Sequence, residues 1–323
     1  MTYHMTLSTE AAFARYEEVR ARLPTAAFPA TSVPRATLAE VAPEVDAFVL
    51  DAFGVLNVGQ TAIPGAVARI AQLRAMGKPL IVLTNAASDT RAAALRKYHR
   101  LGFDFTAEEV VASRDVCAAR LRQHLPGGRW GAISTDVDDF HDLQADIQRW
   151  TAGTRLEVDG FLMLSSANLD PQTYEALRDA LRSNPRPLLV ANPDLVAPRE
   201  TGLSQEPGFY AHALADETSC APIFFGKPFG NAYDDVKARL PGIPPDSIAM
   251  VGDTLHTDVL GGAEGGVKAG QITGNGEKDG EGTAPVITAG LAPDSRHRAV
   301  AGFCCLTRCR SASIKTLPGA PQG

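Results

Sequence analysis

The sequence has few cysteines, no long apolar run and no excess of positive charge. Its five cysteines are unevenly spaced among 323 residues, which excludes the disulfide framework of a small secreted domain. No segment approaches the roughly 20 consecutive apolar residues that a membrane-spanning helix requires, and residues 1–23 lack the apolar core of a signal peptide. The formal net charge of -6 argues against a nucleic-acid or membrane partner. We therefore expect a cytoplasmic globular protein.

The end of the chain, residues 276–323, shows no clear periodicity. Cys304, Cys305 and Cys309 lie there, but their spacing lacks the paired pattern of a metal site. Only His297 lies nearby, so we predict no metal in this segment. The composition favours a disordered tail, and a shifted reading frame near the end is the alternative interpretation.

Apolar runs of strand length alternate with helical segments from residue 45 onward. The apolar runs at 48–50 and 78–83 alternate with the segments 64–77 and 90–100, in which apolar residues have helical spacing. This order implies parallel strands joined by right-handed crossovers.

A second alternating series begins after Gly127 and Gly128. It includes a helical stretch near 137–150, and the first pattern resumes with PIFFGKP at 222–228. The sequence thus predicts an α/β fold, a doubly wound parallel sheet interrupted by a smaller α/β domain. The predicted parts are an N-terminal helical extension (1–44), a core domain (45–127 and 216–275), an inserted domain (128–215) and the tail (276–323).

Polar residues follow four of the apolar runs. Ligands bind at the carboxyl ends of strands in open α/β sheets, so these residues are candidates for one site. Each of them alone is also typical of a turn or a helix cap, and their joint occurrence favours catalysis. They are Asp51, Thr84 with Asn85, Lys227, and Asp253 with Asp258.

This ordered set of residues resembles the haloacid dehalogenase superfamily, whose members are mostly Mg²⁺-dependent phosphatases. A long insertion between the second and third motifs, GKP at 226–228 and GDTLHTDVLGG at 252–262 are similar to subclass IIA, the NagD-like and pyridoxal-phosphatase-like proteins. The resemblance covers residues 45–275. It implies a Rossmann-like core with an inserted cap domain of the C2 type, and a small phosphorylated metabolite as substrate.

The resemblance also implies a role for each candidate. Asp51 would attack phosphorus and become an aspartyl-phosphate, and Lys227 would neutralise both Asp51 and the phosphate. Mg²⁺ prefers oxygen ligands, which would come from Asp51, Asp253, Asp258 and the backbone carbonyl of Phe53. Contacts to phosphate or substrate are implied for Thr84, Asn85 and Gly54.

Phe53 departs from the phosphatase pattern, in which a second Asp two residues after the nucleophile acts as general acid and base. That help contributes roughly 10²–10⁴-fold, and a phenyl ring cannot give it. Three interpretations stay open. The protein is a phosphatase that uses good leaving groups, water or a substitute acid; or it is a pseudo-phosphatase that binds a phosphorylated ligand; or it is a dehalogenase-type hydrolase, which the two acids Asp253 and Asp258 disfavour.

The inserted domain is predicted to cover the phosphate site and to select the substrate. In similar proteins the segment ANPD, residues 191–194, faces the active site, so Asn192 and Asp194 are candidates for substrate contact. A turn stabilised by Asp and Pro is the equal alternative. Relatives also imply a homodimer, and we interpret His256 as structural rather than catalytic.

Overall fold

The chain forms two main sheets in a computed structural model that describes residues 7–28, 32–154, 157–199, 202–272 and 287–289. The cysteine cluster Cys304, Cys305 and Cys309 lies outside the described residues. Among the described residues, no helix combines the length and apolar character needed to cross a bilayer.

The larger sheet has seven strands in the order β1-β16-β15-β14-β2-β5-β6. The five strands from β15 to β6 run parallel, and the short strands β16 and β1 add antiparallel pairs at one edge. The strands span Val33–Arg35 (β1), Ala47–Leu50 (β2), Leu80–Thr84 (β5), Val110–Ala112 (β6), Ile248–Gly252 (β14), Lys268–Ile272 (β15) and Ile287–Ala289 (β16).

Helices cover both faces of this sheet, because successive side chains of the strands point to opposite faces. Phe48 and Leu50 pack on one face with α2 (Leu38–Val41), α3 (Ala66–Ala75) and α4 (Arg91–Arg100). Val49, between them, packs on the other face with α5 (Ser113–Ala118) and α9 (Gly230–Arg239). The predicted doubly wound α/β fold is therefore confirmed.

The second sheet has five parallel strands in the order β13-β10-β9-β7-β8. Its strands span Arg129–Ile133 (β7), Asp146–Arg149 (β8), Gly160–Met163 (β9), Leu188–Val190 (β10) and Ile223–Phe224 (β13). One face packs against α7 (Pro171–Ser183) and α8 (Pro207–Glu217), while the other packs against α5 and α6 (Leu121–His124) of the larger unit.

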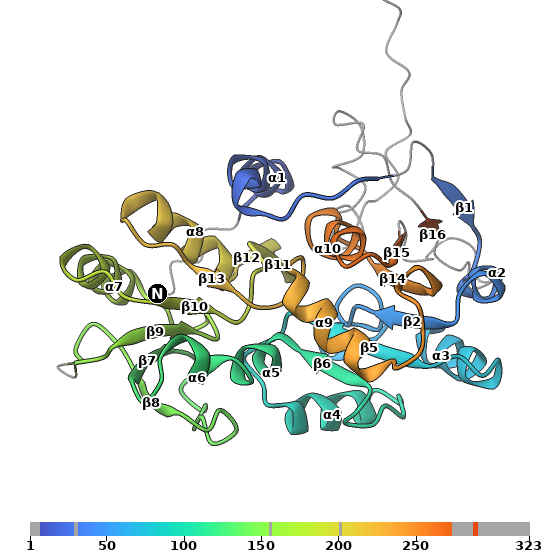
Figure 1. The fold of residues 1–323 in the computed structure, drawn as a ribbon, viewed down its shortest axis with the longest axis horizontal. Helices are drawn as coiled ribbons and strands as arrows, with labels where there is room; N and C mark the ends of the chain where they lie inside the picture. Colours follow the sequence, from blue (N-terminus) through green and yellow to red (C-terminus); the bar gives the residue numbers. More distant parts are fainter. Residues whose placement is uncertain (1–6, 29–31, 155–156, 200–201, 273–286, 290–323) are drawn as a thin grey trace, which may run out of the picture.

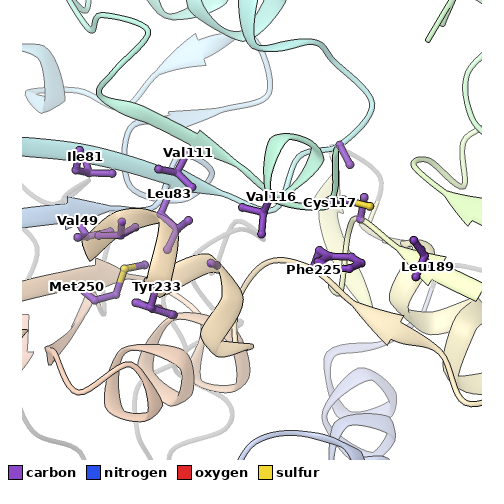
Figure 2. Packing of buried hydrophobic residues seen from close by; sticks show 14 of the residues in the cluster. Val49, Ile81, Leu83, Val111, Val116, Cys117, Leu189, Phe225, Tyr233 and Met250 are labelled. Atoms are coloured by element: carbon purple, nitrogen blue, oxygen red, sulfur yellow. The ribbon is translucent and has the colours of Figure 1, made fainter. Parts of the chain in front are cut away.

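A single hydrophobic cluster joins the two sheets. It runs from Val49 and Ile81 in the larger sheet through Val116 on α5 to Phe225 and Leu189 on the side of the second sheet (Figure 2). The two α/β units therefore share one core.

The helix α1 (Thr9–Glu18) precedes both sheets and lies beside α8 and α10 (Leu260–Glu264) (Figure 1). Ser8 caps it by accepting a hydrogen bond from the backbone of Ala11. Two antiparallel hairpins complete the described fold: β3 (Asn57–Val58) with β4 (Thr61–Ala62), and β11 (Val196–Arg199) with β12 (Gly202–Gln205).

Three expectations from the sequence differ from the structure. The helix predicted near 137–150 is wrong: this segment forms turns followed by β8, which pairs with β7. Its acids Asp138 and Asp142 instead bind the buried guanidinium of Arg114. The apolar run of 222–228 does not rejoin the first sheet, because β13 pairs with β10. Residues 287–289, assigned to the tail, form β16.

Candidate active site

Polar side chains meet where three neighbouring parallel strands end. Asp51 follows β2, Asp253 follows β14 and Thr84 ends β5, and β2 lies between the other two strands in the sheet. All three side chains are buried. Parallel strands bring their carboxyl ends to one edge, which is why residues distant in sequence converge there.

Lys227 completes this group from the segment that follows β13. Its Nζ lies 2.5 Å from Oδ1 of Asp51 and 2.6 Å from Oδ1 of Asp258. The backbone of Lys227 is held by the side chain of Asn85, whose Oδ1 accepts from its N–H and whose Nδ2 donates to its carbonyl, each at 2.8 Å. The ammonium group is therefore fixed between two carboxylates.

Asp51, Asp253 and Asp258 each offer a carboxylate oxygen, and these three atoms lie within 4.8 Å of one another. Asp258 lies on the π-helical turn Leu255–Val259, and its Oδ2 accepts from the backbone N–H of Thr254 at 3.1 Å. Such turns are frequent at functional sites.

Burial and neighbouring charges shift the pKa values of Asp51, Asp253 and Lys227. Burial raises the pKa of Asp51 well above its usual range, and the charge of Asp258 raises it further, against the opposing effect of Lys227. Burial and Asp258 also raise the pKa of Asp253 to about 7. Burial by itself would lower the pKa of Lys227, but the charges of Asp258 and Asp51 outweigh it and raise that pKa.

These residues fit a divalent cation. When the three carboxyl groups are ionised, they and the ammonium of Lys227 carry a formal charge of -2 in a buried cluster, and hard cations such as Mg²⁺ take oxygen ligands. The predicted fourth ligand, the backbone carbonyl of Phe53, stays a prediction. Phe53 is half-buried.

Two other predicted residues shape the site from within the core. Gly54 has a φ of 86°, and a Cβ built on it would lie 2.1 Å from Oδ2 of Asp253. Its observed role is thus to leave room for that acid. The hydroxyl of Thr84 accepts from the N–H of Ala86 at 3.2 Å.

The loop 191–195 of the second unit contacts this group. Nδ2 of Asn85 donates to Oδ1 of Asp194 at 2.8 Å, and Oδ1 of Asn192 accepts from the N–H of Asp194 at 3.0 Å. Nδ2 of Asn192 lies 3.4 Å from an oxygen of Glu206. The side chain of Asn192 therefore shapes the loop, while Asp194 reaches the core.

Some side chains at the site were missed by the sequence analysis. The hydroxyl of Tyr16, on α1, accepts from the N–H of Leu195 at 3.2 Å, and its ring stacks on His256 with centroids 4.5 Å apart. The hydroxyl of Ser113 donates to the carbonyl of Asn85 at 2.8 Å. The amphipathic pattern of α1 could reveal its buried face, but not which unit that face contacts.

Comparison with known proteins agrees with the geometry. A haloacid dehalogenase-like hydrolase model matches residues 48–144, and a second HAD-hydrolase-like model matches residues 224–293. Human glycerol-3-phosphate phosphatase is 33% identical over 253 residues, which cover 70% of this chain and 78% of that protein. The chain belongs to the haloacid dehalogenase-like hydrolases, and the predicted assignment to subclass IIA is confirmed. That the chain is a variant of this subclass with an aromatic residue, Phe53, in place of the second Asp stays a prediction.

Solved structures share the fold. A p-nitrophenyl phosphatase from Archaeoglobus fulgidus superimposes with a TM-score of 0.60 at 22% identity, covering 70% of this chain and 85% of that one. A glycerol phosphate phosphatase from Mycobacterium tuberculosis, in complex with magnesium, superimposes with a TM-score of 0.58 at 26% identity, covering 71% and 68%.

Proposed function

We propose that the protein is a Mg²⁺-dependent phosphatase that hydrolyses a small phosphorylated metabolite through an aspartyl-phosphate at Asp51. The observation that carries this proposal is the position of Lys227, whose buried ammonium group joins Asp51 to Asp258 beside Asp253. A carboxylate that attacks a phosphoryl group faces charge repulsion, and these groups provide the means to reduce it.

Each residue has a defined task in the proposed reaction. Asp51 attacks phosphorus, and Lys227 holds both the nucleophile and the phosphoryl oxygens. Asp51, Asp253 and Asp258 would hold Mg²⁺, which supplies Lewis-acid stabilisation of the phosphoryl charge when bound. Thr84 donates its hydroxyl to a phosphate oxygen. Asn85 acts mainly by fixing the backbone of Lys227, to which it is hydrogen-bonded twice.

The substrate is proposed to be a small phosphomonoester such as glycerol phosphate. Support comes from the human relative and from the mycobacterial structure, both of which act on that compound by their names. The second unit, residues 128–215, serves as the cap, since its loop 191–195 contacts the phosphate end of the core. Homodimer formation stays a prediction.

A pseudo-phosphatase that binds a phosphorylated ligand is the second candidate, and Phe53 is the observation that favours it. A phenyl ring neither donates nor accepts a proton, so the residue at position 53 cannot act as the general acid expected there. Lys227, together with Mg²⁺ held by the three acids, would still bind a phosphate group.

The test is hydrolysis of p-nitrophenyl phosphate and of a panel of sugar, glycerol, glycolate and pyridoxal phosphates, with Mg²⁺ and after chelation. We expect Mg²⁺-dependent turnover that Asp51→Asn abolishes, and a phosphoryl group on Asp51 after rapid quenching. The control is Asp46→Asn, an exposed acid just before the same strand, which should leave turnover unchanged. Mg²⁺-dependent binding of phosphomonoesters without turnover would instead support the pseudo-phosphatase.

A further inference from the structure

The proposed reaction needs a proton for the leaving group, and position 53 does not supply one. An alkoxide leaves phosphorus poorly unless it is protonated, and a general acid contributes about 10²–10⁴-fold. Phe53 stands where that acid is expected. If the protein is the proposed phosphatase, on which this inference rests, another residue must give the proton.

The loop 191–195 places one carboxyl group against the phosphate end of the core. A Cβ added to Gly226, next to Lys227, would lie 3.1 Å from Cδ of Pro193, so this loop packs directly on the segment that carries the ammonium. Of the five residues in this loop, Asp194 is partly exposed and the other four are buried. Its Oδ1 binds Asn85, whereas its Oδ2 has no hydrogen-bond partner among the described residues.

The other titratable side chains around this loop are engaged elsewhere. Oε1 of Glu206 accepts from the hydroxyl of Ser204 at 2.6 Å. Nε2 of His256 lies 3.1 Å from Glu17 on α1. The hydroxyl of Tyr16 is buried, and burial raises its pKa far above the range in which a phenol exchanges protons readily.

We propose that Asp194 is the general acid and base of this phosphatase, in place of the carboxyl group that is missing at position 53. In the first step an oxygen of Asp51 bonds to phosphorus, the bond from phosphorus to the leaving oxygen breaks, and the Asp194 proton moves to that oxygen. In the second step the Asp194 carboxylate takes a proton from water, whose oxygen attacks phosphorus. The bond from phosphorus to Asp51 breaks, and phosphate leaves.

The surroundings of Asp194 allow it to hold a proton near neutral pH. Burial raises the pKa of Asp194 to about 7, while Lys227 and the hydrogen bond from Asn85 oppose that rise. Since the first step needs the protonated acid, turnover of an alkyl phosphate should fall as the pH rises above about 7, and this decline should be absent in Asp194→Asn. The charged and titratable groups that face Asp194 are Lys227, Glu206, Asp258 and the hydroxyl of Tyr16.

Asp194→Asn separates proton transfer from docking of the loop, because the amide oxygen can still accept from Asn85. The experiment compares two substrates in Mg²⁺: glycerol phosphate, whose alkoxide needs a proton, and p-nitrophenyl phosphate, whose phenolate does not. We expect turnover of glycerol phosphate to fall about 10²–10⁴-fold. With p-nitrophenyl phosphate we expect a burst of nitrophenolate and then slow turnover, because hydrolysis of the aspartyl-phosphate lacks its base.

Two further variants complete the design. Asp179→Asn makes the same chemical change at an exposed acid on α7 and should leave both substrates unaffected. Phe53→Asp restores a carboxyl group at the usual position, so it should raise the rate of the wild type. In the Asp194→Asn background it should restore turnover of glycerol phosphate at least about tenfold.

Unchanged turnover of glycerol phosphate in Asp194→Asn would overturn the assignment. A second result would also overturn it: Asp194→Asn loses the nitrophenolate burst and the steady-state turnover of both substrates, and adding Phe53→Asp restores neither. A displaced loop would give that result. If the wild type itself shows no turnover that depends on Asp51, this assignment and the proposed function both fail.

Discussion

At three glycines of the site, a neighbouring side chain occupies the space that a Cβ atom would need. A Cβ on Gly252 would lie 2.1 Å from Cγ of Asp258, and a Cβ on Gly226 would lie 2.5 Å from Oδ1 of Asn85. Gly54 combines a similar approach, to Asp253, with a left-handed backbone. The functional groups therefore occupy space that any other residue at these positions would fill.

We expect Gly54→Ala to lower kcat/KM by about 10²-fold, because the methyl group displaces Asp253 by an ångström or more and misplaced catalytic groups cost about that much. Steady-state kinetics with p-nitrophenyl phosphate and titration with Mg²⁺ give the measurement. Gly59→Ala is the matched control, since Gly59 also has a positive φ, of 56°, but nothing within 4 Å of the added Cβ. Similar activity in the two variants would show that the close approach to Asp253 does not matter.

At the scale of elements, α1 stands out because it lies outside both segments that match the family models. It nevertheless contacts both units. Arg15 lies on α1, and Arg22 lies in the turn that follows it. Each places its Nη2 2.6 Å from a carboxylate oxygen of Asp216 on α8. Tyr16 accepts a hydrogen bond from Leu195 in the loop 191–195 and stacks on His256, in the turn that carries Asp258. The helix thus links the loop 191–195 to the turn that carries Asp258, and the stacked ring of His256 agrees with a structural role.

Tyr16→Phe should lower the free energy of unfolding by about 1–3 kcal/mol, because the buried N–H of Leu195 loses its acceptor. Urea denaturation measures the loss, and faster hydrogen exchange in the loop 191–195 would locate it. The control is Tyr174→Phe, whose hydroxyl binds Glu217 at an exposed position. There water replaces the lost bond, and we expect a change within about 0.5 kcal/mol. Equal effects of the two substitutions would contradict the linking role of α1.

At the scale of the whole molecule, α5 holds the two units together. Its apolar side chains belong to the cluster shared by both sheets, and its Arg114 reaches into the second unit. The guanidinium binds Asp138 and Asp142 through two hydrogen bonds each, and its side chain is 1% exposed. A buried cation with two carboxylate partners fixes α5 against the segment 138–142 of the second unit.

Arg114→Met should lower the free energy of unfolding by about 3–5 kcal/mol, because two acids are left in a buried site without their cation. Thermal and urea unfolding check this value. Arg129→Met removes an exposed pair with Asp146, whose side chains are 40% and 50% exposed, and should cost less than about 1 kcal/mol. A loss for Arg114→Met no larger than for Arg129→Met would mean that the cluster does not stabilise the junction.

The sequence by itself determined the fold class, and it predicted that Asp51, Thr84 and Asp253 would lie close together. The apolar runs at 47–50 and 248–252 are each followed directly by an Asp, and the run at 80–84 ends in Thr84. Parallel strands bring such ends together whatever lies between them. These properties depend on local pattern and on a general rule of chain topology. For that reason they could be predicted from one chain.

Tertiary structure alone decided which side chains contact one another across the two units. The segment 137–150 has helical spacing, yet it forms turns and a strand, because Arg114 and the edge of β7 bind it. The two-residue strand β13 joins the second sheet, since its partner β10 lies there. Tyr16 reaches Leu195 from 179 positions away. No local pattern encodes such contacts, because their energy depends on surfaces that exist only after the chain has folded.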